Sequence, residues 1–293
     1  MSLLSDKIRE IEFDRSSGAS QLARSALGVL SFFVRTSKNE TCRGFVEDFS
    51  KLGRRLFEAR PNMAPVQNLV AQIVYEVNAV EETGLVSVRK FAMSRIEEIC
   101  KQSEVAVNQS AGWAATLIGD SGCLATCSYS STVCETFRIA KQQEKRFKVF
   151  VAESRSDDDR FRYGEALAAF LKSIDFPAEV FPDKDVQTYV PKAECVLVGA
   201  DSVLFVGSVI NGKPTYELAV EAKECGIPFY SVCDTSKANT LSYLGKNVEL
   251  KKGFDLVPSN LITGIVTEKG ILGTNAIVEI LKEISKFYEI FIK

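Results

Sequence analysis

Polar side chains that could bind a small molecule follow a buried strand in the last third of the chain. The apolar segment 195–198 runs directly into Gly199-Ala200-Asp201. The unit is completed, in chain order, by an apolar run over 203–210, Asn211, a helix over 215–225 and a second buried strand over 229–233. Asp201 and Asn211 therefore lie beyond the carboxyl end of a strand, where open parallel sheets bind ligands. A carboxylate in this place can also cap a turn or a helix, so Asp201 has a structural alternative.

Hydroxyl groups gather in a second loop, at the start of a helix predicted over 132–142. Ser128, Ser130 and Ser131 lie just before this helix, and Cys127 lies beside them. Hydroxyls and free N–H groups at a helix start suit an anion such as phosphate. Ordinary capping of the helix by a serine is an equally good interpretation. Cys127 is as readily a buried apolar thiol as a reactive one.

Two cations follow other short apolar runs. Arg155 and Lys237 each come shortly after a predicted strand. Because the carboxyl ends of parallel strands share one edge of a sheet, we expect Lys237, Asp201 and the serine loop to lie together. A bound phosphate would lie toward the serines, since Asp201 repels it. The structural alternatives are an exposed loop lysine at 237 and an ion pair between Arg155 and the acidic residues 157–159.

The absence of histidine limits the chemistry that is open to this chain. With a histidine count of 0, His-based catalytic triads and His-containing metal sites are excluded. Acid–base chemistry must come from Asp, Glu, Lys, Tyr or Cys. The 8 cysteines form no C-x-x-C pair and mostly sit in apolar patterns, which indicates free thiols in a reducing cytoplasm. We predict no metal, and no cofactor is indicated.

The composition is that of an ordinary globular protein. Of the 293 residues, 46% are hydrophobic and 25% are charged. A net charge of −2 gives no electrostatic case for nucleic-acid binding. The basic cluster over 141–148 is interrupted by Glu144 and indicates a solvated helix end. No apolar run is long enough to span a bilayer, and the N-terminus lacks the apolar core of a signal peptide. We predict a cytoplasmic protein that contacts neither membranes nor nucleic acid directly.

Two kinds of periodicity divide the chain. In the first hundred or so residues, apolar side chains recur at helical spacing, as at Leu22, Leu30 and Phe33. After that, short apolar runs alternate with helical stretches, which predicts an α/β fold with a Rossmann-like, doubly wound parallel sheet. The predicted strands cover 114–118, 123–126, 149–152, 196–198, 229–233 and 262–266. We therefore expect a helical N-terminal domain over 1–110 and a Rossmann-like domain over 111–293.

Several separated motifs resemble one known superfamily. They are Ser17-Gly18-Ala19, Arg60-Pro61 with Asn68-Leu69, the segments 150–155, 253–258 and 265–270, Val198-Gly199-Ala200-Asp201, Gly207, Val209-Ile210-Asn211, Thr215, Ala219 and Ala222-Lys223. These motifs look like those of the alpha, beta and delta subunits of translation initiation factor 2B, methylthioribose-1-phosphate isomerase and ribose-1,5-bisphosphate isomerase. The resemblance implies a helical N-terminal domain, a Rossmann-like C-terminal domain, and dimers formed through the latter.

The isomerases of this superfamily use a Cys and an Asp that face each other across the sugar. Asp201 matches the Asp, and the segment 125–130 resembles the loop that holds the Cys. An ungapped match puts Ser128 at the position of the catalytic Cys, whereas a shift of one residue puts Cys127 there. A serine hydroxyl needs a neighbouring base to exchange protons near neutral pH, and no histidine is available to provide one.

Further departures concern the cations that would hold a sugar phosphate. Where the enzymes have an Asn-Lys pair, this chain has Asn211-Gly212, with Lys213 one residue away. The arginine that precedes the enzymes' Gly-Ala pair is replaced by Ser17. The ligand-binding residues that the resemblance and the loops predict are Gly18, Ala19, Arg60, Ser128, Ser130, Ser131, Arg155, Asp201, Asn211 and Lys237.

These departures favour a binding or regulatory protein that resembles the initiation factor 2B subunits, with a degenerate pocket for a nucleotide or sugar phosphate. The alternative is a working aldose–ketose isomerase acting on a phosphorylated ribose. Its catalytic pair would be Cys127 and Asp201, with Lys213 or Lys237 on the phosphate. We expect a homodimer or larger oligomer through the C-terminal domain, because the apolar tail 280–292 is a liability on a monomer. The resemblance implies initiation factor 2 or related subunits as partners.

Overall fold

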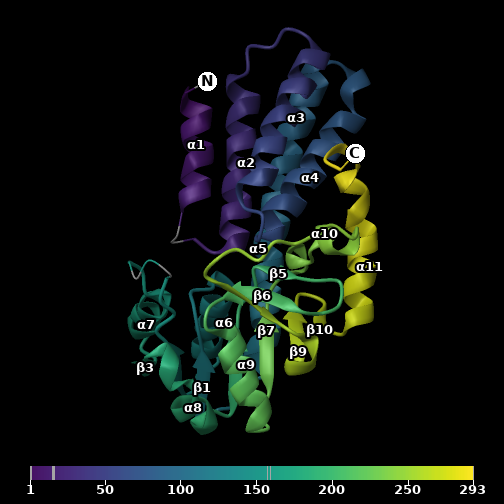
Figure 1. Cartoon of the computed structure of the whole chain (residues 1–293). Helices are drawn as coiled ribbons and strands as arrows, with labels where there is room; N and C mark the ends of the chain where they lie inside the picture. The colour runs from purple at the N-terminus through teal and green to yellow at the C-terminus, as the bar shows by residue number, and fades with distance from the viewer. Residues whose placement is uncertain (1, 15–16, 157, 159, 293) are drawn as a thin grey trace.

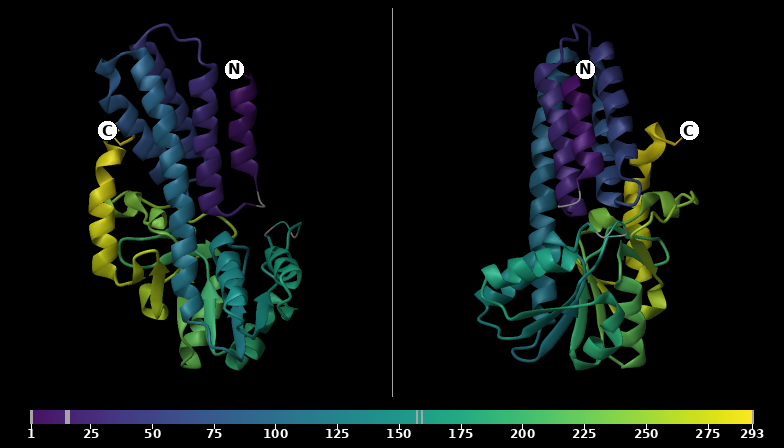
Figure 2. Two further views of the ribbon diagram at one scale, coloured as in Figure 1. Left: turned by 180° about the vertical axis from the view of Figure 1, so that it is seen from behind. Right: turned by 60° about the vertical axis from the view of Figure 1, so that its left-hand side comes forward.

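The chain forms a layer of long helices stacked on a layer of strands and shorter helices (Figure 1). The computed structural model describes residues 2–14, 17–156, 158 and 160–292. The helical layer consists of α1 (Ser2–Phe13), α2 (Ala19–Thr36), α3 (Cys42–Ala59), α4 (Ala64–Ala79) and α5 (Leu85–Thr116). Figure 2 shows the same two layers from behind and from the side. The helical N-terminal region predicted from the periodicity is confirmed.

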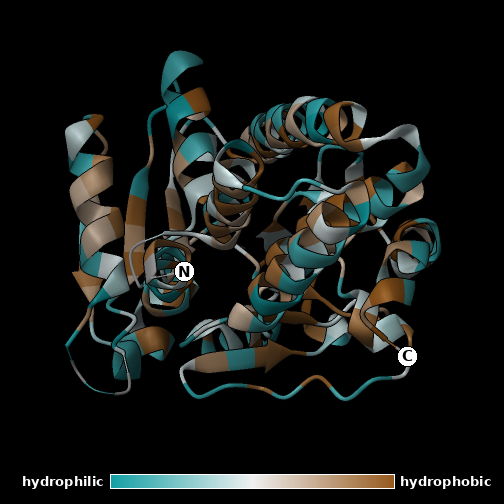
Figure 3. Cartoon of the chain, turned by 90° about the horizontal axis from the view of Figure 1, so that it is seen from above, coloured by the Kyte–Doolittle hydropathy of each residue, from teal (hydrophilic) through white to brown (hydrophobic). Residues whose placement is uncertain are grey.

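The helical layer is held by the apolar residues that recur at helical spacing. Hydrophobic and hydrophilic residues alternate along the helices (Figure 3), as expected where one side of each helix packs on a core. Phe33 on α2 is 5.6 Å from Phe45 and 6.1 Å from Phe49 on α3, measured between ring centroids. Such tilted ring pairs stabilise a core beyond the area that they bury.

Helix α5 continues through residue 110, where the sequence predicts a domain boundary, and ends at Thr116. The segment 114–118, predicted to be a strand, is mostly the last turn of this helix, so that prediction is wrong. Ala114 and Ala115 are fully buried, and the helix packs against the next one in the chain. A short apolar run does not distinguish a strand from a buried helix end, which is why periodicity failed here. The division into 1–110 and 111–293 stays a prediction.

The second layer is built on a seven-stranded sheet with the order β10-β9-β7-β4-β1-β2-β3. Its strands are β1 (Cys123–Thr126), β2 (Lys148–Ala152), β3 (Ala178–Phe181), β4 (Cys195–Val198), β7 (Phe229–Val232), β9 (Gly264–Thr267) and β10 (Gly270–Leu272). All neighbours pair in parallel except β10 and β9. The chain leaves β1 toward β3 and returns to the other side of β1 at β4. This reversal creates a switch point between β1 and β4, the place where such sheets bind ligands.

Helices cover both faces of this sheet, as the near-continuous apolar strands predict. The helices of this layer are α6 (Ser131–Gln142), α7 (Tyr163–Ser173), α8 (Val186–Tyr189), α9 (Thr215–Glu224) and α10 (Thr240–Tyr243). Along β2, Val149 and Val151 join the core on one face, while Phe150 and Ala152 join the core on the other. The predicted α/β class and its parallel sheet are confirmed.

A small antiparallel sheet lies at the carboxyl edge of the main sheet, between the two layers (Figure 1). It contains β5 (Ser202–Val203), β6 (Val209–Gly212) and β8 (Phe254–Val257) in the order β5-β6-β8. The apolar run predicted over 203–210 is therefore two strands joined by a turn. Gly207 lies in that turn with a φ of 78°, a conformation that favours glycine. Gly212 pairs with Phe254, which fixes the register beside the site.

The C-terminal tail folds back onto the helical layer. Helix α11 (Thr274–Ser285) is followed by a 3₁₀ segment over Lys286–Ile290. The ring of Phe291 stacks on that of Phe57 of α3 with centroids 4.5 Å apart, and Tyr288 is buried beside them. Arg54 donates to the main-chain oxygen of Ile290 at 2.8 Å. The expectation that the tail is an exposed apolar patch for dimerisation is wrong, because its own chain covers it.

Candidate functional site

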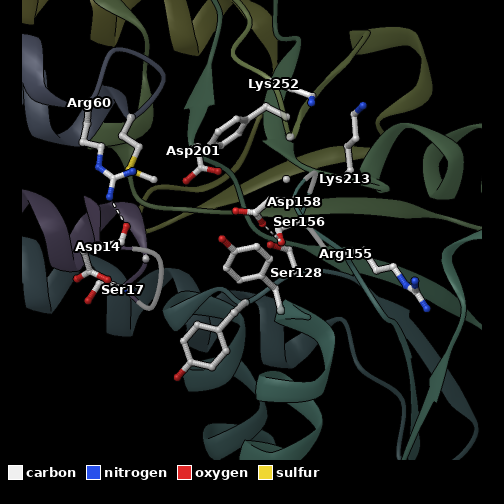
Figure 4. Close-up of a pocket in the computed structure, with 17 residues that line it drawn as sticks. Asp14, Ser17, Arg60, Ser128, Arg155, Ser156, Asp158, Asp201, Lys213 and Lys252 are labelled. Atoms are coloured by element: carbon white, nitrogen blue, oxygen red, sulfur yellow. Dashed lines mark hydrogen bonds between the residues drawn. The ribbon is translucent and has the colours of Figure 1, made fainter. Parts of the chain in front are cut away.

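A cavity of about 490 Å³ lies between the helical layer and the carboxyl edge of the sheet. Seven separate segments of the described chain contribute to its wall, which Figure 4 shows. The connection between α1 and α2 supplies Gly18, and the loop before α4 supplies Arg60. Ser128 and Asp201 come from the loops after β1 and β4, the two strands at the switch point. The cavity therefore occupies the position that the parallel-sheet topology predicts.

Ser128 points into this cavity because its backbone adopts a left-handed conformation, with a φ of 63°. Its backbone N–H donates to the hydroxyl of Ser154 at 2.7 Å, and Ser154 also has a positive φ, of 54°. This hydrogen bond joins the loops that follow the neighbouring strands β1 and β2. Backbone strain of this kind is concentrated at functional sites. A Cβ atom at Gly212 would lie 3.0 Å from the Ser128 hydroxyl, so the opposite wall approaches closely.

Cys127 faces away from the cavity into a buried hydrogen-bond network. Its Sγ lies 3.2 Å from the hydroxyl of Thr215, and only 1% of the residue is exposed. The Thr215 hydroxyl donates to the main-chain oxygen of Gly212 and accepts from Asn211 at 2.9 Å. Burial raises the pKa of the Cys127 thiol to about 12, although the hydrogen bond with Thr215 opposes this. The thiol is therefore protonated at neutral pH, and Asn211 is part of the network that holds it.

Asp201 is placed on the cavity wall by its main chain. Its N–H donates to the oxygen of Ile210 at 2.8 Å, and its oxygen accepts from the N–H of Ala64 at 3.2 Å. Within the described part of the chain, no side chain or N–H group donates a hydrogen bond to its carboxylate. Burial raises the pKa of Asp201, while the positive charges of Lys237 and Arg60 lower it less strongly. Asp201 is thus a carboxyl group whose proton affinity is increased and whose acceptor positions remain open.

Lys237 lies outside the cavity wall, in a buried position. Only 5% of the residue is exposed, and it ends a 3₁₀ turn over Thr235–Lys237. The turn is fixed by Asn68 of α4, which donates to the main-chain oxygens of Ser236 (2.6 Å) and Ala238 (2.7 Å). Lys237 therefore acts on Asp201 through its charge, and the structure does not place it where a ligand in the cavity would touch it.

The starts of two helices meet at the edge of the cavity. Gly18 caps α2, and a Cβ atom there would lie 3.2 Å from the hydroxyl of Ser131, the first residue of α6. Ser130 caps α6 by accepting from the N–H of Val133 at 3.4 Å. Ser130 is therefore the N-cap of α6, which is one of the two roles that the sequence allows for the serine loop. Of these residues, only Gly18 is on the wall of the cavity; Ala19, Ser130 and Ser131 lie behind it.

Both predicted arginines line the cavity and both have partners. Arg60 donates through Nε to the main-chain oxygen of Ile11 at 2.7 Å and also binds that of Asp14, which holds the end of α1. Arg155 pairs with Glu153, with 2.7 Å between Nε and Oε2. Of the acidic residues 157–159 that the sequence offers as partners of Arg155, 157 and 159 lie outside the described residues.

Sequence reasoning missed several residues of the wall, of which Lys252 matters most. Lys213 and Lys252 both line the cavity, and the N–H of Lys213 donates to the oxygen of Gly253 at 3.1 Å. The pairing of β6 with β8 brings these lysines together, and Figure 4 shows both side chains on the same side of the cavity. Neither has a carboxylate partner among the described residues. Tyr129, Tyr163 and Phe254 add aromatic rings, which no local pattern in the sequence indicates.

Among the described residues, the wall carries charges of both signs. Arg60, Arg155, Lys213 and Lys252 supply the positive charges, and Asp14, Asp158 and Asp201 supply the negative ones. Across the described residues, no group of three or more Cys, Asp or Glu side chains is arranged to hold a metal ion. The described helices include none that is long and apolar enough to cross a membrane.

Comparison with known proteins identifies the class. Residues 15–253 match the model of the Initiation factor 2 subunit family. A translation initiation factor eIF-2B subunit 2-like protein of Pyrococcus horikoshii is 32% identical over 278 residues, covering 90% of this chain and 94% of that protein. The ribose 1,5-bisphosphate isomerase of Thermococcus kodakarensis is 26% identical over 306 residues, covering 96% of this chain and 93% of the enzyme. The chain belongs to the Initiation factor 2 subunit family.

Solved structures support the same fold. The crystal structure of the Pyrococcus horikoshii translation initiation factor eIF-2B has a TM-score of 0.80 and 28% identity, covering 93% of this chain and 97% of that one. A chain of the tetrameric eIF2B-beta2-delta2 complex from C. thermophilum has a TM-score of 0.80 at 19% identity, covering 97% of this chain and 94% of that one. The superfamily resemblance predicted from the motifs is confirmed, while the choice between subunit and isomerase is a separate question.

Proposed function

We propose that the protein is a binding and regulatory member of its family, similar to the initiation factor 2B subunits, whose cavity holds a phosphorylated sugar or a nucleotide. One observation carries this proposal. Ser128 shares the cavity with Asp201, whereas Cys127 is buried against Thr215. Aldose–ketose isomerisation needs two groups that exchange protons with the sugar. An unactivated serine hydroxyl opposite Asp201 leaves that pair incomplete.

The wall supports a ligand that carries both phosphate and hydroxyl groups. The carboxylate of Asp201 is open to accept hydrogen bonds from sugar hydroxyls, and it repels a phosphate. Lys213 and Lys252 offer positive charges on the same wall, and neither forms a salt bridge among the described residues, so we place the phosphate at these lysines. This position differs from the one predicted from the sequence, which relied on Lys237 and the serines.

Calorimetry with ribose-1,5-bisphosphate and with AMP tests this proposal. Replacing both lysines, Lys213→Ala with Lys252→Ala, should weaken binding by about a hundredfold or more, because hydrogen bonds to charged groups contribute about 1.5–3 kcal/mol each. Lys251→Ala is a matched control, since Lys251 pairs with Glu249 at 2.7 Å and is outside the wall. Equal loss in the control and the double variant, or no binding of either ligand to the unmodified protein, would contradict the proposal.

The alternative is an aldose–ketose isomerase that acts on a phosphorylated ribose. It is supported by the kinship with a ribose 1,5-bisphosphate isomerase and by the raised pKa of Asp201, which suits a proton-exchanging group. A turnover assay on ribose-1,5-bisphosphate and methylthioribose-1-phosphate separates the two functions. We expect turnover to be absent or very weak. Robust turnover that Asp201→Asn abolishes would establish the isomerase, and Cys127→Ala would then show whether the buried thiol takes part.

We also propose that the protein works in the cytoplasm as an oligomer through its C-terminal domain, with initiation factor 2 or related subunits as partners. The support is kinship with a protein that is named as eIF-2B subunit 2-like and the occurrence of a structural relative in a tetrameric complex. Light scattering should give a mass above the 32.3 kDa of one chain. A monomer mass at every concentration would exclude the homo-oligomer.

A further inference from the structure

One cation of the cavity wall also holds the end of helix α1. Arg60 is the C-cap of α3, and its Nε donates to the main-chain oxygen of Ile11 at 2.7 Å. The same guanidinium donates to the main-chain oxygen of Asp14, a bond that Figure 4 shows as a dashed line from Arg60. Main-chain oxygens in the last turn of a helix have no partner within it and carry the negative end of its dipole, so a cation stabilises them. Because the guanidinium is planar, hydrogen bonds from two of its nitrogens fix its orientation.

The wall of the cavity depends on this attachment of α1. Asp14, Ser17 and Gly18, which follow α1 in the chain, line the same cavity as Arg60. The N–H of Ser17 donates to Oδ1 of Asp14 at 3.0 Å, which ties these two wall residues together. If α1 leaves its place, Arg60 loses the two oxygens that orient it, and the wall residues lose their anchor. A ligand that contacts this side of the cavity therefore binds best when α1 is packed in place.

Helix α1 is attached to the other helices by little buried surface. Of its described side chains, only Ile8 and Ile11 are buried. The neighbouring helix α2, in contrast, has buried residues along its length from Ala19 to Val34. Elements with few buried apolar contacts open locally at a low free energy. The packing of α1 is therefore an equilibrium that a further interaction can shift.

We propose that ligand binding in the cavity and the packing of α1 on the helical layer are coupled through Arg60. The inference rests on the proposed function, because it concerns the ligand of that same cavity. The coupling is positive, since the packed helix orients a guanidinium that can bind hydroxyl or phosphate oxygens of the ligand. It is also reciprocal. A ligand in the cavity holds α1 in place, and an interaction that displaces α1 weakens ligand binding by the same factor.

Amide hydrogen exchange of the full chain, with ribose-1,5-bisphosphate and with AMP as probes, tests the coupling. The amides of α1 should exchange more slowly as the ligand concentration rises. If binding requires the packed helix, exchange slows about a hundredfold at a ligand concentration of about 100 times Kd, and we expect a slowing of at least about tenfold. The tail segment Lys286–Ile290 lies outside the cavity wall, and its exchange by local opening should not respond to ligand.

A variant of the linking residue tests whether Arg60 carries the effect. Arg60→Lys keeps the positive charge but cannot reproduce the planar pair of hydrogen bonds. In this variant α1 should exchange about tenfold faster without ligand, and ligand should slow its exchange much less. Arg54→Lys is a matched control on the same helix, because Arg54 also donates to two main-chain oxygens, those of Ile290 (2.8 Å) and Phe291 (3.2 Å), and is outside the wall. It should speed exchange in the tail and leave α1 and its response to ligand unchanged.

The reciprocal effect is measured on the ligand. Ile8→Ala removes buried packing under α1 at a residue outside the cavity wall, and it should weaken binding several-fold in calorimetry. Ile96→Ala is the matched control, because it makes the same truncation in the same core, on α5. It should lower the melting temperature by a similar amount and leave binding unchanged.

The outcomes separate this inference from the proposed function. Ligand binding without slower exchange in α1 would overturn the coupling and leave the proposed function intact. Equal weakening of binding by Ile8→Ala and Ile96→Ala, or an α1 response in Arg60→Lys equal to that of the unmodified protein, would also overturn the coupling. Calorimetry that detects no binding of either ligand would refute the proposed function, and the coupling with it.

Discussion

Replacement of Asn68 should show how much its hydrogen bonds between the helical layer and the sheet layer contribute to the stability of the fold. Its buried amide donates to the main-chain oxygens of Ser236 (2.6 Å) and Ala238 (2.7 Å). Its carbonyl oxygen accepts from the hydroxyls of Thr240 (2.9 Å) and Tyr288 (2.6 Å). Asn68→Ala removes all these hydrogen bonds and leaves their buried partners without replacements. The change also frees the turn that holds a charged lysine behind the ligand cavity.

The expected loss of stability follows from the number of buried polar groups that lose a hydrogen-bond partner. A buried polar group that loses its partner costs about 1–3 kcal/mol, and losses within one network are not additive. We expect Asn68→Ala to lower the free energy of unfolding by about 3–5 kcal/mol, near the upper end of the range for single substitutions. At about 2–4 °C per kcal/mol for a large domain, the melting temperature should fall by roughly 6–20 °C.

An isosteric variant separates lost hydrogen bonds from lost volume. Asn68→Asp keeps the shape and both accepted hydrogen bonds, but it turns a carboxylate oxygen toward two carbonyl oxygens. At neutral pH we expect it to destabilise the fold at least as much as Asn68→Ala does. Burial raises the pKa of such a carboxyl group. As the pH falls through that pKa, the protonated form can donate to one carbonyl, and the stability difference from the unmodified protein should shrink.

Urea unfolding followed by circular dichroism provides the measurement. Asn78→Ala is a matched control on the same helix, since Asn78 donates to Ser50 at 2.9 Å and to the main-chain oxygen of Val74 at 2.8 Å and does not bridge the layers. The control should cost about 1 kcal/mol. A cost for Asn68→Ala that is no larger than that of the control would refute the reasoning that Asn68 ties the layers together.

Three further predictions concern the cavity. Cys127→Ala should leave ligand affinity in calorimetry unchanged, and iodoacetamide should label exposed Cys225 while sparing Cys127 in the folded protein, because burial keeps its thiol protonated. Gly199→Ala would place a Cβ atom 2.5 Å from the hydroxyl of Ser130 and should cost about 1–3 kcal/mol in urea unfolding. Asp201→Asn should raise the melting temperature at neutral pH, since the raised pKa of Asp201 shows that its charged form is disfavoured. That stabilisation should shrink as the pH falls through this pKa and Asp201 becomes protonated; a constant difference at all pH values would contradict it.

The parallel sheet was predictable because its strands are buried on both faces and therefore read as short apolar runs. The edge strand β3 was not, because it contains Glu179, and three of its four residues are only partly buried or exposed. Strand β5 has two residues, too few for any periodicity. The C-terminal tail over 280–292 was misinterpreted, because apolar residues that pack on their own chain have the same sequence pattern as those that pack on a partner chain. The contacts of the tail with the helical layer, such as that between Phe57 and Phe291, show which applies.

The candidate site was predictable where its residues follow parallel strands. Asp201 and Ser128 could be placed at one edge of the sheet from strand order, and the structure brings both to one cavity. Lys252 could not be placed, because its position depends on the pairing of β6 with β8 across a long stretch of chain. Lys237 was expected beside the ligand because it follows a parallel strand, but the short turn that it ends buries its side chain.

Helix α5 belongs to both layers as one rod of 32 residues, about 48 Å long. Its N-terminal part packs among the other long helices through Val88 and Ile96, and its C-terminal end packs on α6. The ligand cavity lies between the layers and away from this rod. Because this one helix is packed in both cores, a change of the angle between the layers would have to bend α5 or alter its packing in one of them. The continuous helix therefore acts as a strut that opposes opening of the cavity between the layers.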